Sequence, residues 1–210
     1  MSERSFNLFD RRSFMRGVGT FVVGLPALGL GASAPGCGGG LARTPSTVGG
    51  PESLSWKALL VKEGEPGTPL VVTGRVFAAD GRTPVEGVTI HVYHTDARGL
   101  YSEHDGDGRE PRPRLKGWMK TDGGGRYEFR TIRPAPYPGT NNPSHIHTEL
   151  YGAGYAQRWI PSYWFEDDRL VTAEMRARYA GLGAFSPIVS TERGADGVLV
   201  CARDIRLENT

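Results

Sequence analysis

Short stretches of alternating apolar and polar residues, separated by Gly- and Pro-rich turns, are the feature that most constrains how this chain folds. The clearest stretch is 88–94, in which Val88, Ile90 and Val92 lie on one face. A period of two residues is typical of a half-buried β-strand. The 210 residues include 30 Gly and 15 Pro, and signals such as the one at 80–84 predict turns. The sequence therefore predicts an all-β fold, a two-sheet antiparallel β-sandwich with long loops.

Further segments have the same character. The expected strands are 70–77, 88–94, 115–121, 126–132, 145–151, 159–165 and 198–207. Only 172–180 has a helical pattern, with Thr172 as the N-cap and Gly181 as the stop. One short C-terminal helix is therefore expected beside the sandwich.

The last expected strand, 198–207, would close the sheet. Its alternation predicts that Val198, Val200 and Ala202 face inward. Cys201 lies within this apolar segment and is expected to be a buried small hydrophobic residue.

Charge and cysteine content exclude several classes of protein. The formal net charge is +2, which gives no indication of a general nucleic-acid binder. Two cysteines cannot build a disulfide framework, nor a zinc or iron–sulfur site made of thiolates. Residues 105–108 resemble a fragment of a calcium loop but lack its later ligands, so a mobile polar loop is expected there.

Residues 1–36 are predicted to be a twin-arginine export signal. The pair Arg11-Arg12 precedes an uncharged stretch at 17–30 and the small residues at 32–34, which is the order of a secretory signal. The apolar stretch is too short and too rich in Gly for a stable membrane span, which needs roughly 20 apolar residues. We therefore expect the twin-arginine machinery to export the protein to an extracytoplasmic or periplasmic location.

The composition of residues 37–52, rich in Gly, Ser, Thr and Pro, predicts a flexible tether. The sandwich domain is then expected to span 53–210. Two processing outcomes stay open. Either Cys37 is lipidated and anchors the domain to a membrane, or cleavage follows Ala34 and the domain is released.

A His-X-His pair in an expected strand is the first candidate for chemistry. His145 and His147 lie two residues apart, so both imidazoles point to one face and can bind one metal ion. Upstream, Tyr137 lies among three prolines, which restrict the backbone that holds its phenol. Tyr101 follows another strand and a Gly turn. Each tyrosine alone also fits a half-buried aromatic with a hydrogen-bonded hydroxyl, so the metal site depends on all four residues together.

Two phenols and two imidazoles favour a hard trivalent metal ion. Phenolate is a hard anionic donor, and two phenolates with one hydroxide balance the charge of Fe(III), while neutral imidazoles complete the shell. An Fe(II) site with two His and one carboxylate is the alternative, with Glu149 as the next residue on the same face. The leading prediction is one non-haem Fe(III) per chain, bound by Tyr101, Tyr137, His145 and His147.

The order and spacing of these residues resemble the intradiol ring-cleavage dioxygenases, in particular the protocatechuate 3,4-dioxygenase type. The resemblance runs from Gly67 to Asp168, which is close to half of the chain. It rests on these motifs, in order: Gly74-Arg75-Val76, Pro84-Val85-Glu86-Gly87-Val88, Val92-Tyr93-His94-Thr95-Asp96, Gly99-Leu100-Tyr101, Gly125-Arg126-Tyr127, Tyr137-Pro138, His145-Ile146-His147 and Tyr155-Ala156-Gln157-Arg158.

The resemblance implies an iron-bearing β-sandwich enzyme. It would cleave a catechol-type ring with O2 between the two hydroxyl-bearing carbons and give a muconate-type product. The resemblance also implies that Tyr137 and His145 are axial ligands of Fe(III), and that Tyr101 and His147 are equatorial. Tyr137 would be catalytic as well, because the axial tyrosine of the family leaves the metal and helps to take up a proton.

The sequence departs from the family at the expected substrate pocket. Asn142 stands where the family usually has an Arg, Ser162 where it has a Gln, and Trp164 where it has a Tyr. Arg133 and Arg158 are candidates to replace the missing charge, Arg133 with a catalytic role. These departures leave the identity of the aromatic substrate open.

Two other functions are compatible with parts of the pattern. A transthyretin-like surface module without catalysis would also fit the early strands, and a metal-dependent enzyme of different chemistry would fit the same four ligands. The expected partners are a small aromatic diol and O2, with no nucleic acid. The oligomeric state is left open by the sequence.

Overall fold

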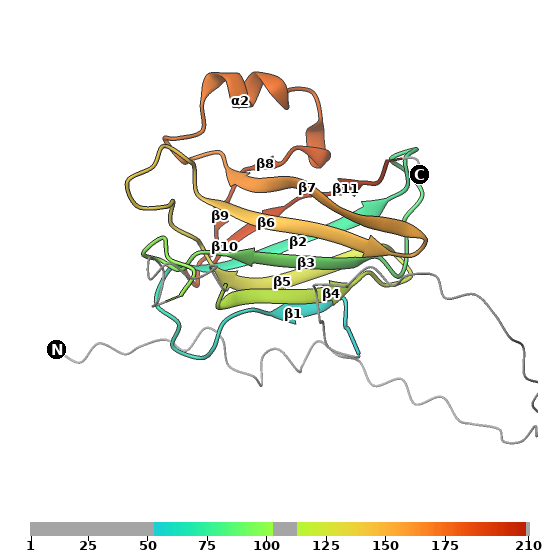
Figure 1. Cartoon of the computed structure of the whole chain (residues 1–210), viewed down its shortest axis with the longest axis horizontal. Helices are drawn as coiled ribbons and strands as arrows, with labels where there is room; N and C mark the ends of the chain where they lie inside the picture. The colour runs from blue at the N-terminus through green and yellow to red at the C-terminus, as the bar shows by residue number, and fades with distance from the viewer. Residues whose placement is uncertain (1–52, 103–112, 209–210) are drawn as a thin grey trace, which may run out of the picture.

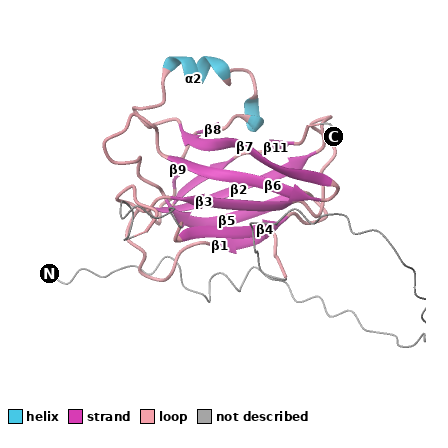
Figure 2. Ribbon diagram, in the orientation of Figure 1, coloured by secondary structure: helices cyan, strands magenta, loops and turns pink. Residues whose placement is uncertain are grey.

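The computed structural model describes residues 53–102 and 113–208, which form a sandwich of two β-sheets (Figure 1, Figure 2). The first sheet has the order β1-β5-β2-β10-β9, and β11 also pairs with β2. Its strands are β1 (Lys57–Leu59), β2 (Pro69–Phe77), β5 (Arg126–Ile132), β9 (Glu192–Arg193), β10 (Leu199–Ala202) and β11 (Ile205–Arg206). The second sheet has the order β4-β3-β6-β7-β8, with β3 (Thr89–His94), β4 (Leu115–Lys120), β6 (His145–Gly152), β7 (Tyr155–Phe165) and β8 (Ile188–Val189).

The pairing within the sheets confirms the all-β sandwich but not purely antiparallel sheets. Strand β1 runs parallel to β5, β10 and β11 run parallel to β2, and β8 runs parallel to β7. Parallel neighbours need a crossover connection. The chain between β2 and β10 supplies one, because it passes through the whole second sheet before it returns. The sheets are therefore mixed and not purely antiparallel as expected, because parallel pairing depends on the path of the whole chain.

The apolar faces of the two sheets form the core. Val88, Ile90 and Val92 are fully buried, as their alternation predicts. Phe129 of β5 and Tyr163 of β7 meet edge to face, with ring centroids 6.0 Å apart. This packing holds β5 of the first sheet against β7 of the second sheet.

The C-terminal segment corrects one expectation. It forms two short strands, β10 and β11, in which Leu199 and Cys201 face inward with 7% and 4% exposure while Val200 is 43% exposed. The inward face is set by pairing with β2, where Leu199 lies opposite Leu70. The predicted inward face of this strand was therefore wrong, whereas burial of Cys201 is confirmed.

The predicted helix is present as α2 (Ala173–Arg178). The Met175 N–H donates a 3.2 Å hydrogen bond to the Thr172 hydroxyl, which confirms Thr172 as the N-cap. A 3-10 turn at Gly183–Phe185 follows and leads the chain back to β8. Within the described part of the chain, no helix is long and apolar enough to cross a membrane. The predicted export signal, the tether at 37–52 and the polar loop at 105–108 lie outside the described residues.

Candidate metal centre

The structure brings the four predicted ligands together at one end of the five-stranded sheet. His145 and His147 are the first and third residues of β6, Tyr137 precedes β6, and Tyr101 follows β3. Strand β6 runs antiparallel to β3, with His147 opposite Tyr93. The start of β6 therefore lies beside the end of β3, and residues far apart in sequence meet there.

The donor atoms of the four side chains form a connected series of close contacts. The Tyr137 hydroxyl contacts the Tyr101 hydroxyl and lies 3.1 Å from Nε2 of His147. Nε2 of His145 lies 3.1 Å from the same Nε2 of His147. Imidazole–metal bonds are about 2.0–2.1 Å long for zinc, so nitrogens with this spacing can bind a single ion. Two phenol oxygens and two imidazole nitrogens thus form a donor set that fits a hard trivalent ion.

A hydrogen bond from the ring nitrogen that faces away from His147 fixes the orientation of the His145 imidazole. Its Nδ1 donates a 2.6 Å hydrogen bond to the carbonyl oxygen of Pro143. A carbonyl can only accept, so the proton of the neutral ring is on Nδ1 and the lone pair of Nε2 faces His147. A backbone carbonyl in this position is a common means of orienting a metal-binding histidine.

Burial keeps both histidines neutral. It lowers the pKa of His145, although the hydrogen bond to Pro143 acts in the opposite direction. The pKa of His147 is lowered to about 4, first by burial and then by the nearby His145 and His94. Neutral imidazole is the form that binds a metal. At pH 7 neither ring therefore has to lose a proton before it binds a metal ion.

Hydrogen bonds tie the loop of Tyr101 to the loop of Tyr137. The Asp96 carboxylate accepts from the backbone N–H of Arg98 at 2.8 Å and of Leu100 at 3.1 Å, which shapes the turn before Tyr101. The Thr95 hydroxyl donates to the Ala135 carbonyl at 2.7 Å, and the Ala135 N–H donates to the Asp96 carbonyl at 3.1 Å. The two tyrosine loops are therefore held as one unit.

Gly99 permits these loops to approach closely. Its φ is +86°, and a Cβ there would lie 2.2 Å from the carbonyl oxygen of Pro136. Both the backbone angle and the contact exclude a side chain at this position. The Gly turn before Tyr101 therefore has a defined role, which is to bring that loop against the proline-rich loop of Tyr137.

Two aromatic residues that lie beside the predicted ligands were not identified from the sequence as part of the site. Tyr93 stacks on His147 with ring centroids 4.6 Å apart. Trp159 is 57% exposed and meets the rings of Tyr93 and His147 edge to face at 5.9 and 6.3 Å. The alternation placed Tyr93 on the outer face of its strand, but only the pairing of β3 with β6 puts it next to His147.

The carboxylate of Glu149 interacts with Gln157 and His91 and not with the four predicted ligands. Gln157 donates a 2.5 Å hydrogen bond to it from its amide nitrogen, and Nδ1 of His91 lies 3.5 Å from its other oxygen. In residues 53–102 and 113–208, no three His, Cys, Asp or Glu side chains form a metal-binding group. The arrangement therefore favours the tyrosine-containing site over the alternative with two His and one carboxylate.

Three of the predicted pocket residues, Asn142, Ser162 and Trp164, lie near the start of β6, whereas Arg158 lies opposite Leu150, toward the other end of that strand. Asn142 is exposed, and its backbone N–H donates to the Thr140 hydroxyl at 3.3 Å. Trp164 lies opposite His145 in the β6–β7 register, and its ring is 5.6 Å from that of Tyr179. Ser162 is half-buried in β7. Their contact with a substrate stays a prediction.

The two arginines proposed to replace the missing charge are engaged in ion pairs. Arg133 binds both oxygens of Asp167 at 2.7 and 3.0 Å and lies 4.0 Å over the Phe165 ring. Arg158 pairs with Glu208 at 2.9 Å. Each charge is thus already balanced by a carboxylate, and a role for either in binding substrate stays a prediction.

The fold and the site together define a β-sandwich protein with a candidate metal centre of two tyrosines and two histidines at one end of a sheet. A family model described as "Dioxygenase" matches residues 45–180. The chain belongs to the intradiol ring-cleavage dioxygenase family.

Individual relatives agree with this assignment. The chain is 37% identical over 121 residues to the protocatechuate 3,4-dioxygenase beta chain of Burkholderia cepacia, covering 53% of this chain and 51% of that one. It is 28% identical over 174 residues to catechol 1,2-dioxygenase 1 of Acinetobacter lwoffii, covering 72% and 55%. The chain therefore spans about half the length of the curated relatives it matches.

Solved structures share the fold. The dioxygenase domain of a dioxygenase carbohydrate-binding protein fusion from Streptomyces sp. SirexAA-E has a TM-score of 0.56 and 24% identity, covering 80% of this chain and 99% of that domain. The 3-chlorocatechol 1,2-dioxygenase of Rhodococcus opacus 1CP has a TM-score of 0.59 and 20% identity, covering 80% and 71%. At these identities the similarity establishes the fold alone.

Proposed function

We propose that the chain binds one ferric ion and cleaves a catechol-type ring with O2 between its two hydroxyl-bearing carbons, giving a muconate-type product. The observation that carries the proposal is the convergence of Tyr101, Tyr137, His145 and His147 through their donor atoms. Relatives named as catechol, chlorocatechol and protocatechuate dioxygenases support the substrate class.

The four residues would have different tasks. A bound ferric ion would supply Lewis-acid activation of the catecholate toward O2. The Pro143 carbonyl holds His145 in its metal-binding tautomer, so His145 would keep its orientation throughout the reaction. The Tyr137 hydroxyl contacts both Tyr101 and His147. Tyr137 would hold the ion as its phenolate, and we assign to this phenolate oxygen the uptake of a proton from the incoming catechol, which would convert Tyr137 to the neutral phenol, as the resemblance to the family implies for this position.

The surroundings favour a catechol with an apolar substituent. Asn142 and Ser162 carry no charge, and Arg133 is paired with Asp167, so the carboxylate of protocatechuate would find little compensation there. Trp159 instead offers an exposed aromatic surface beside His147, and such surfaces bind apolar and aromatic groups. We therefore propose substituted or larger catechols as the preferred substrates.

Oxygen uptake tests this function. The purified, iron-loaded chain is supplied with catechol, protocatechuate and 4-substituted catechols, and the muconate-type product is followed by absorbance and mass. We expect uptake stoichiometric with product, loss of activity in Tyr101→Phe, and retention in Tyr155→Phe, a matched change at the far end of β7. No uptake with any catechol would refute the proposed activity.

The proposed location follows from the first residues alone. We propose export by the twin-arginine route, supported by Arg11-Arg12 and the uncharged stretch at 17–30. Changing both arginines to Lys should leave the precursor inside the cell, and unchanged export would contradict the proposal. Mass measurement of the mature N-terminus separates lipidation of Cys37 from cleavage after Ala34.

A further inference from the structure

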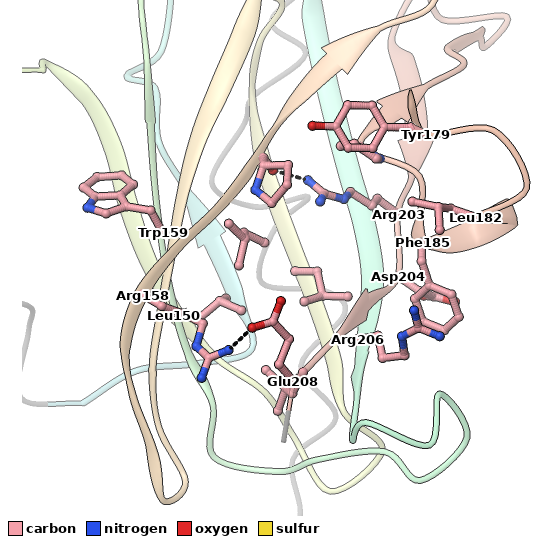
Figure 3. A pocket seen from close by; sticks show the side chains of 15 residues that line it. Leu150, Arg158, Trp159, Tyr179, Leu182, Phe185, Arg203, Asp204, Arg206 and Glu208 are labelled. Carbon is pink, nitrogen blue, oxygen red and sulfur yellow. Dashed lines mark hydrogen bonds and ion pairs between the residues drawn. The ribbon is translucent and has the colours of Figure 1, made fainter. Parts of the chain in front are cut away.

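A second cavity lies on the opposite side of β7 from the metal centre (Figure 3). It has a volume of about 240 Å³ and is bounded by β7, the segment from Tyr179 to Pro187, and the C-terminal residues 203–208. Trp159 is among the residues that line the cavity, and in Figure 3 its ring lies across β7 from Arg203. None of the four predicted metal ligands lines the cavity, so the cavity and the candidate metal centre are distinct, with Trp159 of β7 beside both.

A buried arginine forms part of the cavity wall. Arg203 is 5% exposed, donates a 2.8 Å hydrogen bond to the Pro161 carbonyl and lies 4.7 Å over the Tyr163 ring. Its Nε is buried, and no residue of the described ranges 53–102 and 113–208 forms a hydrogen bond with it. A buried guanidinium is costly unless an anion or acceptor compensates its charge.

The other charged groups of the cavity do not supply that anion. Three arginines line it, Arg158, Arg203 and Arg206, against the carboxylates of Asp204 and Glu208. Glu208 is paired with Arg158 at 2.9 Å, as the dashed line in Figure 3 shows. Asp204 accepts a 2.9 Å hydrogen bond from a backbone N–H. The wall therefore carries one more positive than negative charge, and an anionic ligand would complement it.

The remaining wall is apolar. Leu150, Ile160, Ile205 and Leu207 line the cavity together with Leu182, which is 36% exposed. Pockets for drug-sized ligands measure roughly 300–1,000 Å³, so this smaller cavity suits a single ring or a short chain. An apolar wall around a buried cation favours a ligand with a hydrophobic body and one negative charge.

We propose that this cavity binds a small apolar carboxylate, with the carboxylate toward the guanidinium of Arg203 and the apolar body against Leu182 and its neighbours. The site is independent of the metal centre and of ring cleavage. It would allow a compound of this class to bind while the active site is occupied by a catechol.

Calorimetric titration of the purified full chain with benzoate tests the proposal, with benzyl alcohol as the uncharged control probe. We expect benzoate to bind and benzyl alcohol to bind at least tenfold more weakly. Leu182→Glu places a like charge at the rim and should weaken benzoate binding by about tenfold or more, which corresponds to 1.4 kcal/mol. Val200→Glu is the matched control, because Val200 is also an exposed apolar residue but lies on β10, outside the cavity. It should bind benzoate like the wild type.

Three results would overturn the proposal. They are the absence of benzoate binding, equal weakening by Leu182→Glu and Val200→Glu, and loss of binding in His147→Ala, which would place the benzoate at the metal centre. Sedimentation of Leu182→Glu is measured in parallel. A change of oligomeric state without benzoate binding would instead identify the cavity as an interface between copies of the chain.

Discussion

Gly99→Ala should separate the two tyrosine loops and remove the metal without unfolding the sandwich. The new Cβ would lie 2.2 Å from the Pro136 carbonyl oxygen, against the 3.4 Å at which ordinary contact begins. One loop must therefore move by about 1.2 Å, while metal–ligand distances tolerate only about ±0.2 Å. The left-handed backbone costs about 1–2 kcal/mol for a non-Gly residue, and overpacking adds about 1–3 kcal/mol.

Gly64→Ala is the control for this variant. Gly64 has a φ of +78°, close to that of Gly99, but nothing lies within 4 Å of its Cβ position. The Gly64→Ala variant should lose only the free energy that the left-handed backbone costs, about 1–2 kcal/mol of unfolding free energy. It should keep its iron. Iron per chain is measured after reconstitution, and unfolding free energy by urea titration. Full iron content in Gly99→Ala, or equal effects of the two variants, would refute the proposed role of the close approach.

Three further predictions follow from burial and charge. Burial raises the pKa of the Cys201 thiol to about 12, so iodoacetamide at pH 8 should leave the Cys201 peptide unlabelled until the protein is unfolded; rapid labelling of the folded protein would contradict this. Burial lowers the pKa of His94 from 6.5 to about 4, so the folded state binds fewer protons than the unfolded state. The unfolding free energy should therefore fall by about 3 kcal/mol as the pH drops from 6.5 to 4, and a urea titration series should show a flatter slope in His94→Gln; equal slopes would exclude His94 as the cause. Finally, Asn142→Arg with Ser162→Gln should raise turnover of protocatechuate by a factor on the order of 10²–10³, the usual worth of an electrostatic donor; no gain would mean that the pocket is organised differently.

Local patterns predicted the strands because a half-buried strand alternates along its own sequence. The segment 126–132 became β5 with the same bounds, and the helix began after its predicted cap, Thr172. The inward face of β10 was predicted wrongly, because it depends on the pairing of Leu199 with β2. Parallel pairing likewise depends on the path of the whole chain.

The candidate ligands could be found because each has a distinctive residue type in a distinctive context. The contacts around them could not, since they depend on register and on loop packing. Tyr93 reaches His147 only through the β3–β6 pairing, and Asp96 joins the two loops through backbone hydrogen bonds. Arg203 had no signal in the sequence at all, because its surroundings come from β7 and the segment after α2.

Metal analysis combined with a visible absorption spectrum tests the central claim most directly. The purified chain, reconstituted with ferric iron, should hold about one iron per chain and be red-brown from a phenolate-to-iron charge-transfer band. Tyr101→Phe should weaken that band and His147→Ala should lose most of the iron, whereas Tyr155→Phe should keep both. A protein that stays colourless with ferric iron would contradict the assignment of Tyr101, Tyr137, His145 and His147 as its ligands.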